Sequence, residues 1–99
     1  MTIKLVNRGT EVELLLEDRL DSVSAPEAEK VFLQTAERFD RVILNFAGLK
    51  YISSAGLRLV LKTHQTMRKK NGELVLTHVN KMVMEVLEMT GFAGLLSVQ

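Results

Sequence analysis

The chain has 99 residues, of which 46% are hydrophobic, and its formal net charge at pH 7 is +1. This length and composition predict one folded domain, residues 1–99, with a core of its own. The absence of cysteine excludes disulfides, thiolate metal sites and cysteine nucleophiles, and the near-neutral charge gives no general attraction to nucleic acid or membranes.

No apolar run in the chain approaches the roughly 18 residues that would span a bilayer. The first residues, MTIKLVNRGTEVELLL, alternate between apolar and polar and carry charges, which is not the pattern of a signal peptide. We therefore expect a cytoplasmic protein that does not insert into a membrane and does not bind nucleic acid.

Two strands open the chain, predicted at Thr2–Val6 and Val12–Leu16. The four-residue link between them, NRGT, contains an Arg-Gly pair that favours a hairpin turn. A helix is predicted next, over about Ala25 to Arg38, because Ser24 and Glu27 form a capping box and Pro26 suits a first helical turn. Its apolar face is expected to consist of Ala28, Val31, Phe32, Thr35, Ala36 and Phe39.

The run RVILNF, Arg41 to Phe46, predicts a central strand with both faces buried, and residues 47–52 are expected to be a connection. A second helix follows and is expected to end near Lys70, before the Asn-Gly pair of residues 71–72. Its inward stripe is predicted to be Leu57, Val60, Leu61, His64 and Met67, with Arg58, Lys62, Gln65 and Lys69 facing away.

The last part of the chain predicts a strand at Glu73–Thr77, a helix capped by Asn80 and stopped by Gly91, and a short strand at Ala93–Val98. The inward residues of this helix are expected to be Val83, Val86, Leu87 and Thr90. The element order is β-β-α-β-α-β-α-β. It indicates an α/β fold with a mixed sheet and helices packed on it.

Few residues of the chain are candidates for a catalytic role. The histidines are His64, on an apolar stripe where a structural role is common, and His78, in a loop. A triad of Ser54, His78 and Asp21 can be written down, but the chain lacks the G-x-S-x-G turn of a nucleophile elbow. No group of His, Asp and Glu has metal-ligand spacing, and no glycine motif for phosphates or dinucleotides is present. We expect no cofactor, no metal and no catalytic residues.

Two other groups of residues have both a functional and a structural interpretation. The basic residues Arg58, Lys62, Arg68, Lys69 and Lys70 could face an anionic partner, or could be solvated and complement the end of a helix dipole. We favour the second. The methionines Met82, Met84 and Met89 could form an adaptable contact surface, or fill the core, which suits Met89 best.

The stretch YISSAGLRLVLKT, residues 51–63, places two serines where a strand connection gives way to a helix. A serine at this position can cap the helix with its own oxygen. The unpaired N–H groups of a helix start would also stabilise a phosphoryl group attached there. A phosphate adds about −1.5 to −2 charges, so one phosphorylation could abolish binding to a partner without unfolding the domain.

Over nearly its whole length the chain resembles the anti-sigma factor antagonist family, the stand-alone STAS domains of bacteria. The resemblance lies in the opening hairpin and in the blocks LDSVSAPEAEK, RVILNFAGLKYISSAGLRLVL and KKNGELVLTHVNKMVMEVLEMTGF. The pattern around the serines carries most of it: a hydrophobic pair, a polar residue, the acceptor serine, a small residue, glycine and leucine. The family often has aspartate where Ser53 stands and usually glycine where Asp18 stands.

The resemblance implies that a serine kinase, which is also the anti-sigma factor, phosphorylates the acceptor Ser54, with Ser53 as second choice. In this family the unphosphorylated form binds the kinase and frees a sigma factor, and a serine phosphatase resets the cycle. Asp21 corresponds to the aspartate that the family places near the acceptor. The expected partner-binding residues are Asp21, Ser22, Ser24, Ser53, Ala55, Gly56, Leu57 and Arg58, with Ala55 and Gly56 keeping the helix start open to a partner's backbone.

Two other hypotheses remain. One is a constitutive STAS subunit of a transporter or another complex, without phosphorylation, for which the basic helix face would matter more. The other is a hydrolase that uses Ser54, which the missing nucleophile elbow disfavours.

Overall fold

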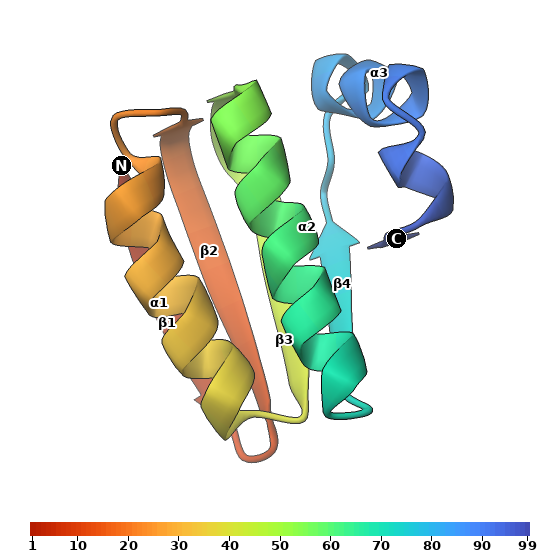
Figure 1. Cartoon of the computed structure of the whole chain (residues 1–99). Helices are drawn as coiled ribbons and strands as arrows, with labels where there is room; N and C mark the ends of the chain where they lie inside the picture. The colour runs from red at the N-terminus through yellow and green to blue at the C-terminus, as the bar shows by residue number, and fades with distance from the viewer.

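The computed structural model describes residues 1–99 as a five-stranded sheet with three α-helices (Figure 1). The elements are β1 (Thr2–Arg8), β2 (Glu11–Leu20), α1 (Ala25–Arg38), β3 (Arg41–Ile52), α2 (Ser54–Lys69), β4 (Glu73–Thr77), α3 (Lys81–Met89), a 3₁₀ turn (Phe92–Gly94) and β5 (Ser97–Val98). The sheet order is β1-β2-β3-β4-β5, with β1 antiparallel to β2 and the other pairs parallel. The predicted mixed α/β fold and its element order are confirmed.

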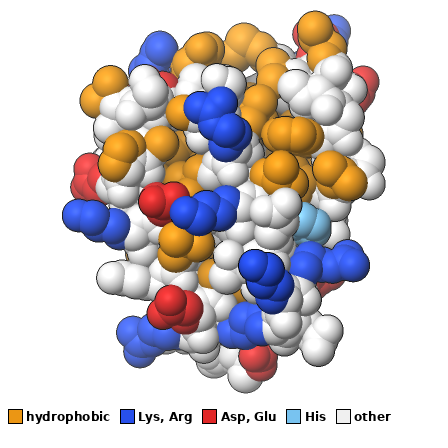
Figure 2. All heavy atoms as spheres, in the orientation of Figure 1, with side chains coloured by type: hydrophobic (Ala, Val, Ile, Leu, Met, Phe, Trp, Pro, Cys, Tyr) orange, Lys and Arg blue, Asp and Glu red, His pale blue; other side chains and the backbone are white.

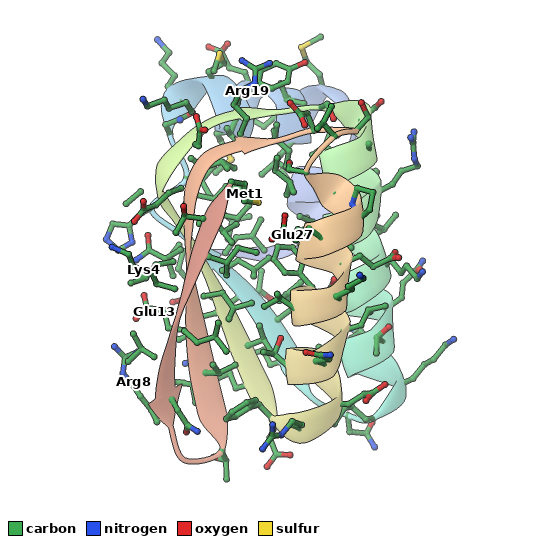
Figure 3. The ribbon with its side chains drawn as sticks, turned by 90° about the vertical axis from the view of Figure 1, so that its left-hand side faces the viewer. Met1, Lys4, Arg8, Glu13, Arg19 and Glu27 are labelled. Atoms are coloured by element: carbon green, nitrogen blue, oxygen red, sulfur yellow. The ribbon has the colours of Figure 1, made fainter.

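Helices α1 and α2 lie side by side on one face of the sheet (Figure 1). The other face carries no helix, as the view turned by 90° shows (Figure 3). The core lies between the sheet and the two helices, where Phe32 of α1, Val60 of α2 and Leu44 of β3 are fully buried. None of the helices is long and apolar enough to cross a membrane.

The open face of the sheet carries paired charges. Figure 3 shows Lys4, Arg8 and Glu13 pointing away from the helices. An Arg8 guanidinium nitrogen lies 2.9 Å from a Glu13 carboxylate oxygen, and Arg41 bonds to Glu73 at 2.7 Å and also to Glu11. The long charged side chains lie over the apolar residues that the central strands place on this face. The face is therefore stable in water without a helix.

Both opening strands are longer than predicted, and the link between them is only Gly9-Thr10. Gly9 has φ +86°, and its N–H donates to the Asn7 side-chain oxygen at 3.0 Å. Glycine adopts this conformation without strain. The hairpin itself is confirmed.

The prediction that residues 47–52 form a connection is wrong, because β3 continues to Ile52. It continues because β2 also extends, to Leu20, and the extensions pair in parallel across two register shifts. At one shift Asp18 has φ +80°, the left-handed region that favours the glycine usual in the family. A Cβ on Gly48 would lie 2.9 Å from the Leu16 carbonyl oxygen, so this close approach of the strands requires glycine.

Helix α1 has the predicted bounds, and the predicted inward residues are buried except for Val31, which is half-buried. The inward stripe of α2 differs from the prediction. The residues of α2 that are buried are Gly56, Leu57, Leu59, Val60, Thr63 and Met67, whereas Leu61 and His64 are only half-buried. Thr63 is tolerated in the core because its hydroxyl donates to the Leu59 carbonyl at 2.8 Å.

Strand β4 has the predicted bounds, and Asn80 caps α3 as predicted, its side-chain oxygen accepting from the Val83 N–H at 2.8 Å. Gly91, at φ +80°, ends that helix. Of its four predicted inward residues only Val83 and Leu87 are buried; Val86 is half-buried and Thr90 exposed. The last strand is shorter than predicted because residues 92–94 form a 3₁₀ turn.

Candidate functional site

The two loops that the sequence singled out meet at one end of the sheet. Strands β2 and β3 are parallel and pair to their last residues, Leu20 with Ile52. The Ser53 N–H donates to the Leu20 carbonyl at 2.9 Å. The loop after β2 and the start of α2 are therefore fixed against each other at the carboxyl end of the sheet, the usual location of sites in open α/β sheets.

Gly56 is what allows α2 to begin so close to β2. A Cβ on Gly56 would lie 2.6 Å from the Leu20 carbonyl oxygen and 2.8 Å from Ile52 Cγ1. Gly56 is buried, and the neighbouring Leu57 is buried too. The expectation that Gly56 keeps the helix start open to a partner is therefore corrected, because the space at this glycine is filled by the chain's own β2.

The two adjacent serines have different surroundings. Ser53 is half-buried and is the N-cap of α2, its hydroxyl accepting from the Gly56 N–H at 3.4 Å. Ser54 is the first residue of the helix, and its side chain is exposed and without a hydrogen-bond partner in the chain. The backbone N–H groups of Ser54 and Ala55 donate to no protein acceptor. The exposed hydroxyl thus lies at a helix start with free donors.

The loop before α1 is organised by Asp21. One carboxylate oxygen accepts from the Val23 N–H at 3.0 Å and the Ser24 N–H at 3.1 Å. The Ser24 hydroxyl accepts from the Asp21 N–H and donates to the Arg19 carbonyl. The predicted capping box of Ser24 and Glu27 is wrong, because the Ser24 hydroxyl is used inside the loop and makes no cap bond to α1.

These bonds lower the pKa of Asp21. The largest cause is the hydrogen bond from the Ser24 backbone; desolvation, the next largest, acts in the opposite direction, and the Arg19 side chain and the Val23 backbone add to the lowering. Asp21 is therefore a carboxylate at neutral pH. Its oxygens are engaged by its own loop, so it shapes the surface beside Ser54.

Arg19 joins this loop to the end of β3. Its Nε donates to the second Asp21 carboxylate oxygen at 3.3 Å, and its guanidinium carbon lies 4.5 Å from the centroid of the Tyr51 ring. Both residues point outward at this end of the molecule, where Figure 3 labels Arg19. The sequence reasoning missed this pair, which depends on the parallel register of Arg19 with Tyr51.

A groove of about 340 Å³ runs from the site along the junction of α1 and α2. It is lined by Ser22, Ala25, Pro26, Glu29, Ala55, Arg58, Leu59 and Lys62. Lys62 pairs with Glu29 at 3.0 Å, whereas the exposed Arg58 has no acidic partner. Arg58 lies one turn after Ser54 on the same helix face.

The basic run is not one continuous surface. Lys70 donates to the carbonyls of Ala36, Glu37 and Phe39 at 3.0 to 3.1 Å, so it caps the end of α1 rather than serving its own helix. Lys62 is paired with Glu29. Arg58, near the site, is therefore separated from the cations at the other end of α2.

The sequence-predicted residues fall into two groups. Asp21, Ser22, Ser24, Ser53, Ala55 and Arg58 lie with Ser54 at this end of the molecule, exposed or half-buried, whereas Gly56 and Leu57 support it from beneath. The structure gives Ser54 no hydrolase machinery: its hydroxyl bonds to no histidine, and Asp21 is held by its own loop. His64 lies ten residues further along α2, and burial followed by the Arg68 charge lowers its pKa.

The three methionines of α3 are mostly at the surface. Met82 is 51% exposed and Met89 86% exposed, while Met84 is half-buried. The expectation that Met89 fills the core is wrong, because Val83 and Leu87 occupy the inward face of this short helix.

Comparisons with known proteins agree with the fold described above. A family model described as the STAS domain matches residues 3–99. BtrV of Bordetella bronchiseptica, named as a candidate anti-sigma factor antagonist, is 40% identical over 80 residues, which cover 77% of this chain and 69% of BtrV.

Several solved structures share the fold, and two of them illustrate the similarity to this chain. SpoIIAA of Bacillus in its phosphorylated form matches with a TM-score of 0.78 and 18% identity, over 99% of this chain and 91% of that one. A sulfate transporter family protein from Wolinella succinogenes matches with a TM-score of 0.80 and 18% identity, over 94% and 79%. At these identities the likeness concerns the fold alone.

Proposed function

This chain belongs to the STAS domain family, and from that membership we propose that it is an anti-sigma factor antagonist controlled by phosphorylation. In its unphosphorylated form it binds an anti-sigma factor that is also a serine kinase, and thereby frees a sigma factor in the cytoplasm. The kinase phosphorylates Ser54, which ends the binding, and a serine phosphatase restores it. The chain itself is a binding module and catalyses no reaction. BtrV, the relative at 40% identity, is named for the antagonist role.

The observation that carries this proposal is the difference between the two serines. The Ser53 hydroxyl is engaged in capping α2, whereas the Ser54 hydroxyl is exposed and free. Ser54 can enter a kinase active site without breaking a bond of the fold. A phosphate on it would lie beside the free N–H groups of Ser54 and Ala55 and within reach of Arg58.

The energetics favour a switch of binding over a switch of fold. A phosphoserine adds about −1.5 to −2 charges to the surface. Opposite a partner carboxylate at about 4 Å, each unit charge costs roughly 4 kcal/mol at an effective dielectric of about 20. A micromolar complex is worth only about −8 kcal/mol, so one phosphate is enough to dissociate it.

The proposed partner surface surrounds Ser54. It consists of the Asp21–Ser24 loop, Ser53, Ala55 and Arg58, with the groove between α1 and α2 beside them. The hydrogen bonds within the loop fix its shape before binding, so little conformational entropy is lost when a partner docks.

Phosphate mapping tests the acceptor. The purified chain is incubated with ATP and the anti-sigma factor kinase encoded nearest to its gene, and the product is examined by intact mass and peptide mass spectrometry. We expect one phosphate per chain, on Ser54. Ser54→Ala should remain unmodified, and Ser53→Ala should still gain one phosphate.

Two results contradict the proposal. A phosphate on Ser53 of the wild-type chain, or full phosphorylation of Ser54→Ala, refutes the assignment of the acceptor. A wild-type chain that neither binds the kinase nor accepts phosphate from it refutes the antagonist function.

A further inference from the structure

Exposed apolar side chains are concentrated at the end of the molecule that carries Ser54. Six large ones are exposed: Leu5, Val23, Tyr51, Met82, Met89 and Leu95. Four of them belong to segments at the carboxyl end of the sheet, namely the loop after β2, the end of β3, and α3. In Figure 2, which views the molecule from the side of α1 and α2, most of the hydrophobic side chains lie in the upper part, with a few charged ones among them, and charged side chains predominate in the lower part. Grouped apolar exposure of this kind marks an interaction surface.

The largest group is on α3. Met82, Val86 and Met89 are spaced i, i+4, i+7 and therefore share one face of the helix. Tyr51 lies beside Met82 and Val86: together with Ile52 and Val83, these three side chains line an apolar hollow of about 60 Å³. We call Tyr51, Met82, Val86 and Met89 the α3 patch.

The α3 patch is fixed to the Ser54 site by two contacts. The Arg19 guanidinium lies over the Tyr51 ring and bonds to Asp21, which connects the patch with the Asp21–Ser24 loop. The Asn80 amide donates to the Leu49 carbonyl at 3.3 Å, which ties the start of α3 to β3. Tyr51 precedes Ser54 by three residues. The loop, the start of α2 and the Tyr51 side of the α3 patch thus adjoin one another at this end of the molecule.

We propose that the α3 patch is the second part of the surface that binds the anti-sigma factor, and that it receives a cluster of apolar side chains of that partner. This inference rests on the proposed function. Methionine side chains adapt to an apolar partner, and tyrosine and arginine are, with tryptophan, the residue types enriched among those that dominate interface energies. The outward charges of α3, Glu85 and Glu88 against Lys81, are net negative and do not suit an anionic lipid surface.

The two parts of the surface then have separate tasks. The α3 patch supplies binding energy by apolar burial, which a phosphate on Ser54 does not remove. The residues around Ser54 position its hydroxyl in the active site of the kinase. They also make the affinity sensitive to the charge of a phosphate on Ser54. Loss of the patch should therefore weaken binding and raise the KM for phosphorylation, with kcat and the acceptor serine unchanged.

A pair of double variants tests this division. Met82→Ser with Met89→Ser removes two exposed apolar side chains from the patch. Leu5→Ser with Leu95→Ser removes two other exposed apolar side chains, at 53% and 60%, from β1 and from the segment before β5. The probe is the anti-sigma factor kinase encoded nearest to the gene, and the readouts are its Kd for each full-length chain and the KM and kcat of phosphorylation. Met82→Leu with Met89→Leu serves as the conservative variant.

We expect the serine pair on α3 to raise Kd and KM by about tenfold or more, with kcat unchanged and the phosphate still on Ser54. The control pair and the leucine pair should bind within about twofold of wild type. The proposal is overturned if the α3 serine pair binds as tightly as wild type or loses no more than the control pair. It is also overturned if the free chain forms a dimer that the α3 serine pair abolishes, because the patch would then bind a second copy. A wild-type chain that does not bind the kinase at all refutes the proposed function and this inference together.

Discussion

The open face of the sheet and the start of α2, at the carboxyl end of the same sheet, differ in whether their polar groups have partners within the chain. On the open face Arg8, Glu11, Glu13, Arg41 and Glu73 are joined by ion pairs. At the carboxyl end the Ser54 hydroxyl, the N–H groups of Ser54 and Ala55, and the Arg58 guanidinium have no partner within the chain.

The difference separates groups that hold the fold from groups that are available to another molecule. A paired charge on the open face contributes to stability, and its loss changes the folded protein. A free hydroxyl or N–H group at a helix start contributes little to stability and can form new bonds. Substitutions in the two regions should therefore affect different measurements.

The largest effect on stability is expected where the carboxyl end itself depends on packing. In Gly56→Ala the new Cβ meets the Leu20 carbonyl oxygen at 2.6 Å, so β2 and α2 must separate. We expect a loss of about 2–3 kcal/mol in the free energy of unfolding, measured by urea denaturation. Gly94→Ala is the matched control, since no atom lies within 4 Å of its Cβ, and should change stability by less than about 0.5 kcal/mol. Equal effects of the two would contradict the packing role of Gly56.

Arg41→Gln tests the open face. This substitution removes the charge that bonds to both Glu11 and Glu73. We expect a loss of about 1 kcal/mol at low ionic strength, shrinking in high salt, because the pairs are partly exposed. The affinity for the kinase should not change. A change in that affinity at unchanged stability would mean that the open face is also a binding surface.

Substitutions of the two adjacent serines should have smaller effects on the free energy of unfolding, and these effects should differ from each other. Ser53→Ala removes the cap of α2 and should cost about 0.5–1 kcal/mol, at the low end for a cap because its bond is long. Ser54→Ala removes a hydroxyl without a partner and should change the free energy of unfolding by less than about 0.3 kcal/mol. Denaturation of both variants under the same conditions checks this order. The reverse order would mean that Ser54, and not Ser53, caps α2.

The smallest effect concerns pH. The pKa of Glu13 lies below its usual 4.5, chiefly because Asn45 donates a hydrogen bond to the carboxylate, with Arg8 acting in the same direction. The folded pKa is lower than the unfolded one, so the stabilisation is present above the unfolded pKa and is lost as the pH falls through the folded pKa. Glu13→Gln should cost about 0.5 kcal/mol at pH 7 and approach wild type in acid. A constant difference from pH 7 to pH 3 would contradict this.

Much of the fold could be predicted from local patterns. The bounds of α1 and β4 and the cap at Asn80 were predicted correctly because each depends on periodicity or on a turn residue a few positions away. The full length of β3 could not be predicted in this way. Residues 47–52 are extended because the end of β2 pairs with them, a contact between segments about 30 residues apart.

The site shows the same division. The small residues and serines of residues 53–56 indicated a helix start, and the family resemblance favoured Ser54 over Ser53 as acceptor. That Ser53 alone caps the helix, and that Ser24 bonds within its loop instead of capping α1, depend on side-chain geometry. For α3 the sequence left two interpretations of the methionines open, a contact surface or core filling, and wrongly favoured the core for Met89, which is exposed because Val83 and Leu87 occupy the inward face.

One measurement tests the central claim, that a single phosphate on Ser54 changes binding and not the fold. The chain is phosphorylated stoichiometrically, and its Kd for the kinase and its free energy of unfolding are compared with those of the unmodified chain. We predict a Kd at least about 100-fold weaker and a free energy of unfolding within about 0.5 kcal/mol. Equal affinities of the two forms, or loss of affinity only through unfolding, would contradict the account.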